Sequence, residues 1–337
     1  MEEFEKRGID TNTKNQLVAN SKPTHELEAK FFEQARYLFS ADSNGTVKQL
    51  SLRQGEVVND YGNKFHNKTI YAMTSTKNSK YIFTGDEAGN LRQISVVDGE
   101  VVKDYGKIFK ATVTSMTTSP DSRYLLCGDE NGNIKQYDCQ LRTMVREFKK
   151  ALPGAALTIA VSPDSESFFT AGSQGHCKQF NINTGEVIRD FKKVHKGSIF
   201  SICVSADANY LFTSDKYGYV KQYSVKDGLL VKDYGKTHER FIYAMSTSGD
   251  AKWLFVTGNR GCMKQFDIKK QECHKDFGRV HEADSDICAL IVGPNSQFMW
   301  SSDDAGNVKE WNCQTGELLR EFNGLHNGRI HGLACVH

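Results

Sequence analysis

A six-residue apolar segment returns seven times along this chain of 337 residues, and successive copies begin 43 to 45 residues apart. Repeats of this length that contain several short strands are typical of propeller blades. We therefore predict an all-β fold: a seven-bladed β-propeller with four antiparallel strands per blade. The repeated segments are Tyr37–Asp42, Tyr81–Asp86, Tyr124–Asp129, Ser167–Gly172, Tyr210–Asp215, Trp253–Gly258 and Phe298–Asp303.

Each unit divides into strands a, b, c and d. In the second unit, residues 70–74, 81–84, 91–94 and 101–105 give these strands in order. A glycine lies in every b–c turn, eight residues after the start of the repeated segment. We predict that it requires a positive φ or a close backbone approach, and we expect no helix inside the array. The structural glycines are Gly45, Gly89, Gly132, Gly175, Gly218, Gly261 and Gly306.

Two further positions repeat. Strand a carries a small residue such as Ala72, which suits the innermost strand, where the blades converge. Strand c carries a basic residue such as Lys48, and an acid such as Asp60 lies twelve residues later in strand d. We expect these charges to meet across the c–d hairpin as a solvated ladder, worth about 0.2–1 kcal/mol per pair. The alternative is a charged binding stripe on the rim.

The first unit lacks a clear strand a, whereas the chain ends on an unpaired one at residues 330–336. We therefore predict that this C-terminal strand joins the N-terminal blade and closes the ring, which removes exposed sheet edges. The alternative is that residues 27–32 supply the missing strand. Residues 1–30 form a polar tail in this scheme, partly disordered or with a short helix within residues 26–35, and residues 31–337 form the propeller.

The composition restricts the kinds of partner and the cellular location that we expect. The formal net charge is +2, so the chain has no strong attraction to nucleic acid or an anionic surface. No apolar stretch is long enough to span a membrane, and the N-terminus lacks the apolar core of a signal peptide. The nine cysteines form no Cys-x-x-Cys pair, which favours free thiols and a cytoplasmic or nuclear location.

On the repeat length, the strand order and the turn residues, residues 37–337 resemble the WD40 (WD-repeat) propeller family as a divergent member. The resemblance implies a tetrad of a histidine before strand a, a Ser or Thr in strand b, an Asp in the b–c turn and a Trp in strand c. Histidines at the matching offset, given a structural role, are His195, His238, His281 and His326. The aspartates lie three residues before the turn glycine instead of directly before it, so the sequence leaves open whether the tetrad forms.

No motif indicates catalysis. The chain contains no Gly-x-Ser-x-Gly, no Walker loop and no His-Glu-x-x-His, and its histidines recur once per repeat instead of converging. We therefore predict no catalytic residues, no metal and no cofactor. A propeller enzyme is the least favoured alternative.

The favoured function is a scaffold that binds other proteins through the loop faces, as a monomeric propeller within a complex. Irregular aromatic and basic residues in the d–a and b–c loops are candidate protein-binding residues, although some aromatics could simply pack between blades. These candidates are Phe109, Lys110, Tyr217, Tyr219, Arg240, Phe241 and Arg260. The alternative is binding of a lipid head group or nucleic acid through the basic residues Lys68, Lys110, Lys196, Arg240 and Arg329.

Overall fold

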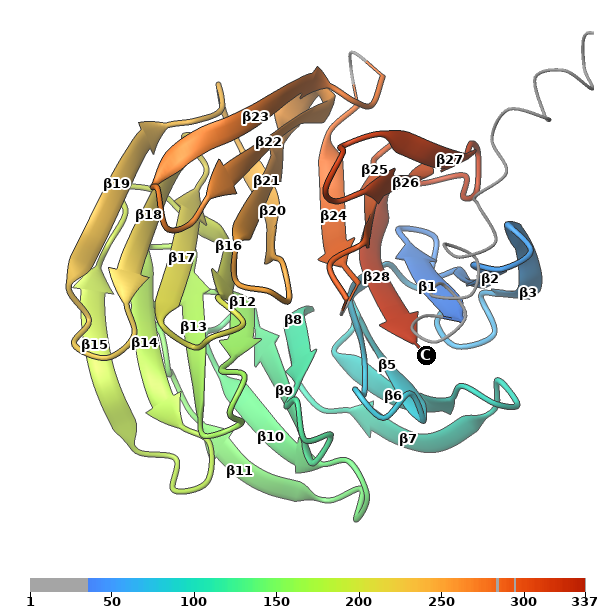
Figure 1. Ribbon diagram of the computed structural model, residues 1–337. Coiled ribbons are helices and arrows are strands. Elements are labelled where there is room, and N and C mark those ends of the chain that lie inside the picture. The colour runs from blue at the N-terminus through green and yellow to red at the C-terminus, as the bar shows by residue number, and fades with distance from the viewer. Residues whose placement is uncertain (1–35, 283–284, 294, 337) are drawn as a thin grey trace, which may run out of the picture.

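The computed structural model describes residues 36–282, 285–293 and 295–336, and it contains seven four-stranded antiparallel sheets. Figure 1 shows the sheets arranged radially, with one strand of each near the centre and another on the outer rim. The predicted seven-bladed β-propeller is therefore confirmed. The expected tail of residues 1–30 and the helix expected within residues 26–35 lie outside the described residues.

Within each blade the four strands follow one another from the central channel to the outer rim. From the inside outward, blade 1 has β28 (Ile330–Val336), β1 (Tyr37–Asp42), β2 (Val47–Ser51) and β3 (Glu56–Gly62). Blade 2 has β4 (Ile70–Ser75), β5 (Tyr81–Asp86), β6 (Asn90–Ser95) and β7 (Val101–Lys107). Blade 3 has β8 (Val113–Thr118), β9 (Tyr124–Asp129), β10 (Ile134–Asp138) and β11 (Met144–Phe148). Blade 4 has β12 (Ala156–Val161), β13 (Ser167–Gly172), β14 (His176–Asn181) and β15 (Val187–Lys193).

Blade 5 has β16 (Ile199–Val204), β17 (Tyr210–Asp215), β18 (Tyr219–Ser224) and β19 (Leu230–Lys236). Blade 6 has β20 (Ile242–Thr247), β21 (Trp253–Gly258), β22 (Cys262–Asp267) and β23 (Glu272–Arg279). Blade 7 has β24 (Ile287–Val292), β25 (Phe298–Asp303), β26 (Val308–Asn312) and β27 (Leu318–Phe322). A short 3-10 turn, η1 (Asn259–Gly261), forms the b–c loop of blade 6. It is a single turn of three residues, and the described part of the array contains no α-helix, as expected.

The hydrophobic core lies between neighbouring blades. In β1, Phe39 packs against Ile82 of blade 2, whereas the adjacent Leu38 packs against Trp300 of blade 7. Successive side chains of a strand point to opposite faces of the sheet, and here both faces are covered by another blade. This two-sided burial explains why strand b is a continuous apolar run instead of an alternating one.

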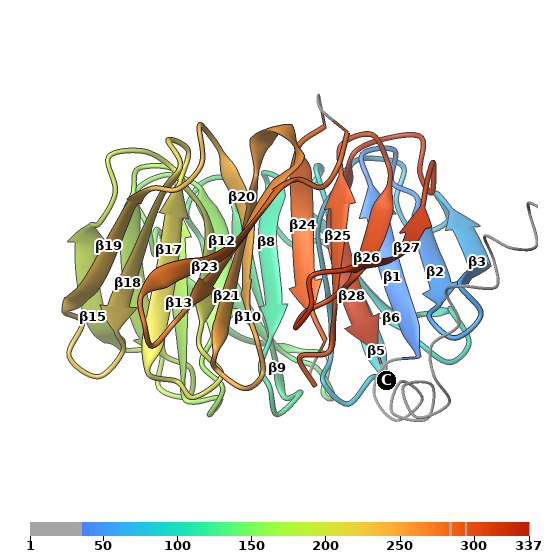
Figure 2. The ribbon, with the colours of Figure 1, turned by 45° about the horizontal axis from the view of Figure 1, so that its top comes forward.

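The ring closes through the C-terminal strand. Strand β28 pairs antiparallel with β1, from Tyr37 opposite Val336 to Asp42 opposite Ile330. The prediction is therefore confirmed, and β28 occupies the inner edge of β1 that residues 27–32 would have needed. Figure 2 shows β28 between β1 and β24.

Each b–c glycine meets both of its predicted requirements. The φ angles of the seven lie between 65° and 89°, a region that disfavours other residues. A Cβ atom at these positions would lie 2.0 to 2.8 Å from a carbonyl oxygen of the following d–a turn, such as His66 O above Gly45. Replacement by any other residue would therefore strain the backbone and push the d–a turn away.

The predicted charge ladder forms in all seven blades. The strand c base lies 2.6 to 4.0 Å from the strand d acid, from Lys309–Glu321 to Lys221–Asp233. The acids remain 31–52% exposed, so each pair contributes only about 0–1 kcal/mol.

The strand c glutamine is buried in all six blades that carry it, with side chains at most 5% exposed. In three blades the hydroxyl of a strand d tyrosine, twelve residues later, donates to the Gln Oε1. These pairs are Gln49–Tyr61, Gln93–Tyr105 and Gln222–Tyr234. In the other three the twelfth residue is Phe148, Phe191 or Phe277, and the Gln Oε1 has no hydrogen-bond partner among the described residues. The amide also links blades, because Gln93 Nε2 donates to the Cys139 carbonyl in blade 3.

The Gln–Tyr pairing yields a stability prediction. Replacement of Tyr105 by Phe removes a buried hydrogen bond and should lower the free energy of unfolding by about 1–3 kcal/mol. The reverse change, Phe191→Tyr, supplies the missing donor to Gln179 and should raise it by about 0.5–1.5 kcal/mol. Urea unfolding measures both values. Tyr71→Phe is the control, because its hydroxyl makes no hydrogen bond within the described part of the chain; equal effects at all three sites would refute the pairing.

Ring closure yields a second prediction. A chain truncated after residue 329 lacks β28 and should melt at a markedly lower temperature, because β1 then exposes a sheet edge. A permuted chain, with residues 330–336 moved in front of β1 through a copy of an a–b turn, keeps all 28 strands and should recover the stability. Calorimetry compares the three proteins, and an unchanged melting temperature after truncation would contradict the closure.

Candidate functional site

Seven residues, one from the start of each innermost strand, surround the central channel. Each is skipped by the strand pairing: Ile70 pairs with Asp86 and Ala72 with Gly85, so Tyr71 between them has no partner. Such a bulge redirects a side chain out of the sheet. We call these residues the bulge ring. They are Tyr71, Thr114, Leu157, Phe200, Tyr243, Cys288 and His331.

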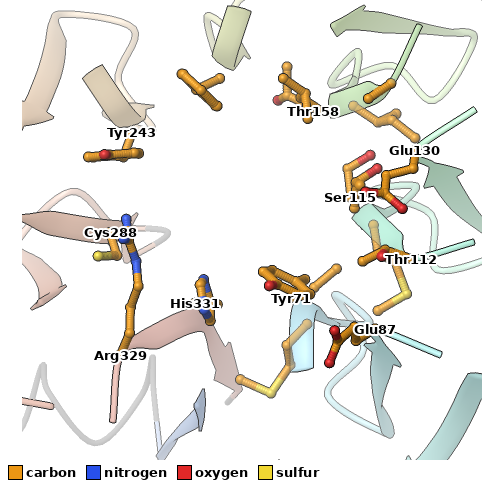
Figure 3. A pocket seen from close by; sticks show the side chains of 18 residues that line it. Tyr71, Glu87, Thr112, Ser115, Glu130, Thr158, Tyr243, Cys288, Arg329 and His331 are labelled. Carbon is orange, nitrogen blue, oxygen red and sulfur yellow. The ribbon is translucent and has the colours of Figure 1, made fainter. Parts of the chain in front are cut away.

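The bulge ring lines a cavity of about 680 Å³ at the channel mouth, on the face that gathers the d–a and b–c loops. Figure 3 shows Arg329 beside Cys288, with Glu87 and Glu130 on the opposite side of the cavity. The walls therefore combine aromatic rings with charges of both signs. A pocket of this size fits one or a few side chains of a bound segment.

One wall is built from stacked rings and a cation. Phe241 stacks on Tyr243 with ring centroids 5.5 Å apart, and Phe200 packs edge-on to Phe241 at 5.9 Å. The guanidinium of Arg329 lies 4.9 Å from the centre of the Tyr243 ring, a cation–π distance. Burial raises the pKa of the Tyr243 hydroxyl and lowers that of the His331 imidazole to about 4. Neutral His331 and cationic Arg329 thus face the cavity at pH 7.

The residues predicted for binding fall into three groups. Arg240, Phe241 and Arg260 come together where blades 5 and 6 meet: the Arg240 amide donates to the side chain of Asn259, next to Arg260. Tyr217 and Tyr219 are 46% and 40% exposed on the same face in blade 5.

Lys110 and Phe109 complete the set. Lys110 is exposed. Phe109 is 5% exposed and packs with Leu125 and Tyr137 of blade 3, under the ammonium group of Lys135. This burial corrects its placement among surface anchors and agrees with the alternative that it packs between blades.

Apart from Phe241, the sequence analysis did not assign a binding role to the aromatic wall. The sequence nevertheless contained a pattern that marks the position lining the channel. The bulge ring residue directly precedes the repeated small residue of strand a, and it differs in chemistry from blade to blade, whereas the neighbouring positions repeat. A position that varies inside a regular repeat is not constrained by the contacts that hold the propeller together.

The histidine network forms with the displaced aspartate. In blade 7, His281 Nδ1 lies 2.8 Å from the Asp303 carboxylate, which can only accept, so Nδ1 carries the proton. The Ser301 hydroxyl then donates to Nε2 at 2.7 Å and accepts from Trp311 Nε1 at 2.9 Å. Three other blades repeat the His–Asp and His–Ser/Thr contacts, at His66, His195 and His326.

Two segments of the chain, residues 103–138 and 185–224, match the WD40 family of repeats (WD domain, G-beta repeat). Each runs from strand d of one blade through strand c of the next. The two matched segments and the seven-bladed ring together support a WD-repeat β-propeller. A comparison with curated proteins finds none that matches it.

The network of this WD-repeat propeller resembles a Ser–His–Asp catalytic triad in its hydrogen bonds. Ser301, His281 and Asp303 are, however, at most 5% exposed, so a substrate could not reach the hydroxyl. Within the described residues, no three His, Cys, Asp or Glu side chains are grouped to hold a metal ion. No helix of the described chain is long and apolar enough to cross a membrane. The network is suited to fastening blades.

Hydrogen bonds keep the buried aspartates of the network charged. Desolvation alone would raise the pKa of Asp303, but hydrogen bonds from His281 and Asn307 outweigh it and lower that pKa below its usual value. Asp42, Asp86 and Asp215 follow the same pattern. These carboxylates stabilise the fold above the pKa of an unfolded aspartate, about 3.9, and their contribution is lost as the pH falls from that value through their lower folded pKa values.

His238 of blade 6 is an exception among the four predicted structural histidines. The strand b and turn positions that face it hold Val256 and Gly258, and its Nε2 has no hydrogen-bond partner in the described structure. Burial, with a smaller effect of Lys264, lowers its pKa to about 4. His238 is thus neutral at pH 7, and its Nδ1 lies 3.0 Å from the Thr237 hydroxyl.

The His238 environment predicts a pH effect. Between about pH 6.5 and pH 4 the unfolded chain binds a proton at His238 that the folded chain does not, so stability should fall as the pH falls, by up to about 1.4 kcal/mol per pH unit. The substitution His238→Leu introduces the residue type that blade 4 has at the equivalent position, Leu152. It should remove the part of the pH-dependent loss of stability that His238 causes. Urea unfolding at several pH values measures the difference; identical slopes for both proteins would refute the low pKa.

Proposed function

We propose that this protein is a non-catalytic scaffold that binds a partner protein over the channel mouth. The bulge ring is the observation that carries the proposal, because it directs seven side chains of six different kinds into one open cavity. Aromatic residues and arginine are the usual anchors of protein interfaces, and Tyr71, Phe200, Tyr243 and Arg329 supply both. WD-repeat propellers generally bind other proteins and typically lack enzymatic activity, which supports the proposal. We place this role in the cytosol or the nucleus, as the free cysteines suggest.

The cavity is better suited to a protruding segment of a partner protein than to a flat interface. Tyr71 is 40% exposed and contacts the His331 ring at 4.8 Å, so a bound side chain could insert beside it without displacing core residues. Arg329 forms no ion pair with a described residue, and its guanidinium is held in place by the Tyr243 ring. A preorganised cation next to an aromatic wall lowers the entropic cost of binding.

A variant of the channel mouth tests the proposal. Tyr71→Ala, Phe200→Ser and Arg329→Gln together remove the anchors, and we expect bound partners to fall at least about tenfold in affinity purification from the native cell. The matched control, Leu141→Ala with Leu229→Ala, truncates residues that are 73% and 66% exposed in c–d hairpins on the opposite face. Melting curves verify that both variants are folded.

Three results are possible. Partners that are lost with the channel variant and kept with the control support the scaffold and its face. Partners that are lost only with the control would move the interface to the opposite face. If the wild-type protein retains no partner in stoichiometric amount, the scaffold proposal fails.

A further inference from the structure

A second cavity lies away from the channel, in the groove between blades 3 and 4. Its volume is about 580 Å³. The d–a turn of Leu152, Pro153 and Gly154 forms an apolar floor, and the walls carry Lys150, Lys178 and His176 together with Asn131 and Asp190. Figure 1 shows these two blades side by side, with β14 and β15 on the outer part of the ring.

The groove carries excess positive charge. Asp190 is the only acid among the described residues that line it, and it already lies 3.9 Å from Lys178. Lys193 adds a further cation: it pairs with His176 across strands β14 and β15, and residues opposite each other in an antiparallel pair project to the same face. Lys150 and Lys193 are both exposed.

Two lysines of blades 3 and 4 occupy strained backbone positions, and one of them, Lys150, lines the cavity. Lys150 has φ 49° and Lys192 has φ 57°, in the left-handed region that non-glycine residues rarely adopt. The equivalent positions in the other five blades are glycines with positive φ. These glycines are Gly62, Gly106, Gly235, Gly278 and Gly324.

Hydrogen bonds establish the equivalence. The Lys192 amide donates to Asp190 as the Gly106 amide donates to Asp104, and the Lys150 amide donates to Asn133 as the Gly324 amide donates to Asn307. A Cβ at any of the five glycines would meet no atom within 4 Å. Conformation alone therefore explains the glycines, and blades 3 and 4 carry a lysine where glycine would be less strained.

We propose that the groove between blades 3 and 4 binds an acidic segment, rich in Asp and Glu, of a partner protein. This rests on the protein-binding function proposed above but uses a different surface. A strained residue that the fold does not need is retained for a purpose outside the fold, and Lys150 is such a residue and a cation that lines this cavity. Lys150, Lys178 and Lys193 are separate point charges along the groove instead of arginine forks converging on one anion, which suits several carboxylates on an extended chain.

Other anions fit less well. The lining residues include no Phe, Tyr or Trp ring on which a nucleic-acid base could stack. The Leu–Pro–Gly floor offers contact for the aliphatic part of a peptide, which an inositol phosphate lacks. Both ligands serve as competing probes.

The test measures binding of the full chain to a fluorescent peptide of alternating Glu and Ser residues by anisotropy. We expect affinity that weakens with salt, because the contacts are between charges. Lys150→Gly with Lys193→Gln should weaken binding by about tenfold or more, because charge-assisted contacts are lost. The control changes Lys107 and Lys236 to Gln; these lysines lie opposite Asn90 and Tyr219 as Lys193 lies opposite His176. It should bind as the wild type does.

Stability provides an independent readout. Lys150→Gly relieves the strained φ, so its melting temperature should rise while its peptide affinity falls, and loss of binding cannot then be attributed to unfolding. The channel-mouth variant should keep its affinity for the peptide, which separates this proposal from that of the scaffold face. Equal binding by the groove variant and the wild type would overturn the proposal. Tighter binding of inositol hexakisphosphate or of a single-stranded oligonucleotide at the same lysines would also overturn it.

Discussion

The ring depends on the d–a turn, which fastens each blade to the next in two ways. Its backbone lies against the b–c glycine of the preceding blade: the His195 amide donates to the Gly175 carbonyl, and the His195 carbonyl covers the Gly175 Cα. Its side chain reaches the following blade, where His195 contacts Thr213 and Asp215. Since His326 joins Gly306 of blade 7 to Ser40 of blade 1, the same contact also closes the ring.

Because the frame is held at these turns and between the blade faces, other positions are free to vary. Phe109 and Leu152 replace the histidine with apolar side chains and leave the backbone contact to the glycine intact. The bulge ring is freer still: strand pairing skips its residues, and the channel leaves room for any side chain. The contacts that hold the blades together thus involve other residues than those that line the channel. This explains how a regular repeat can carry an irregular surface.

The sequence predicted the main features that repeat with the blade. The strand order, the closing strand, the glycine turns and the charge ladder all follow from period and spacing, because each is set by contacts that recur seven times. It could not predict the wall of Phe200, Phe241 and Tyr243, because these rings meet across blades that are 41 to 43 residues apart in the chain. Nor could it show that the displaced aspartate reaches the histidine, since the loop geometry that turns Asp303 inward is not a property of spacing.

Blades 3 and 4 depart from the frame more than their neighbours. The d–a residues that enter them are apolar, Gly172 stands where blade 5 has Asp215, and lysines hold positions that glycine holds elsewhere. Each departure alone could be neutral drift within a tolerant fold. Lys150 is different, because a substitution to glycine would relieve its backbone strain, and at the equivalent Gly324 of blade 7 a Cβ would meet no atom within 4 Å. A sequence tends to break a local rule at a cost where function requires it, and Lys150 does so at a cavity that carries excess positive charge.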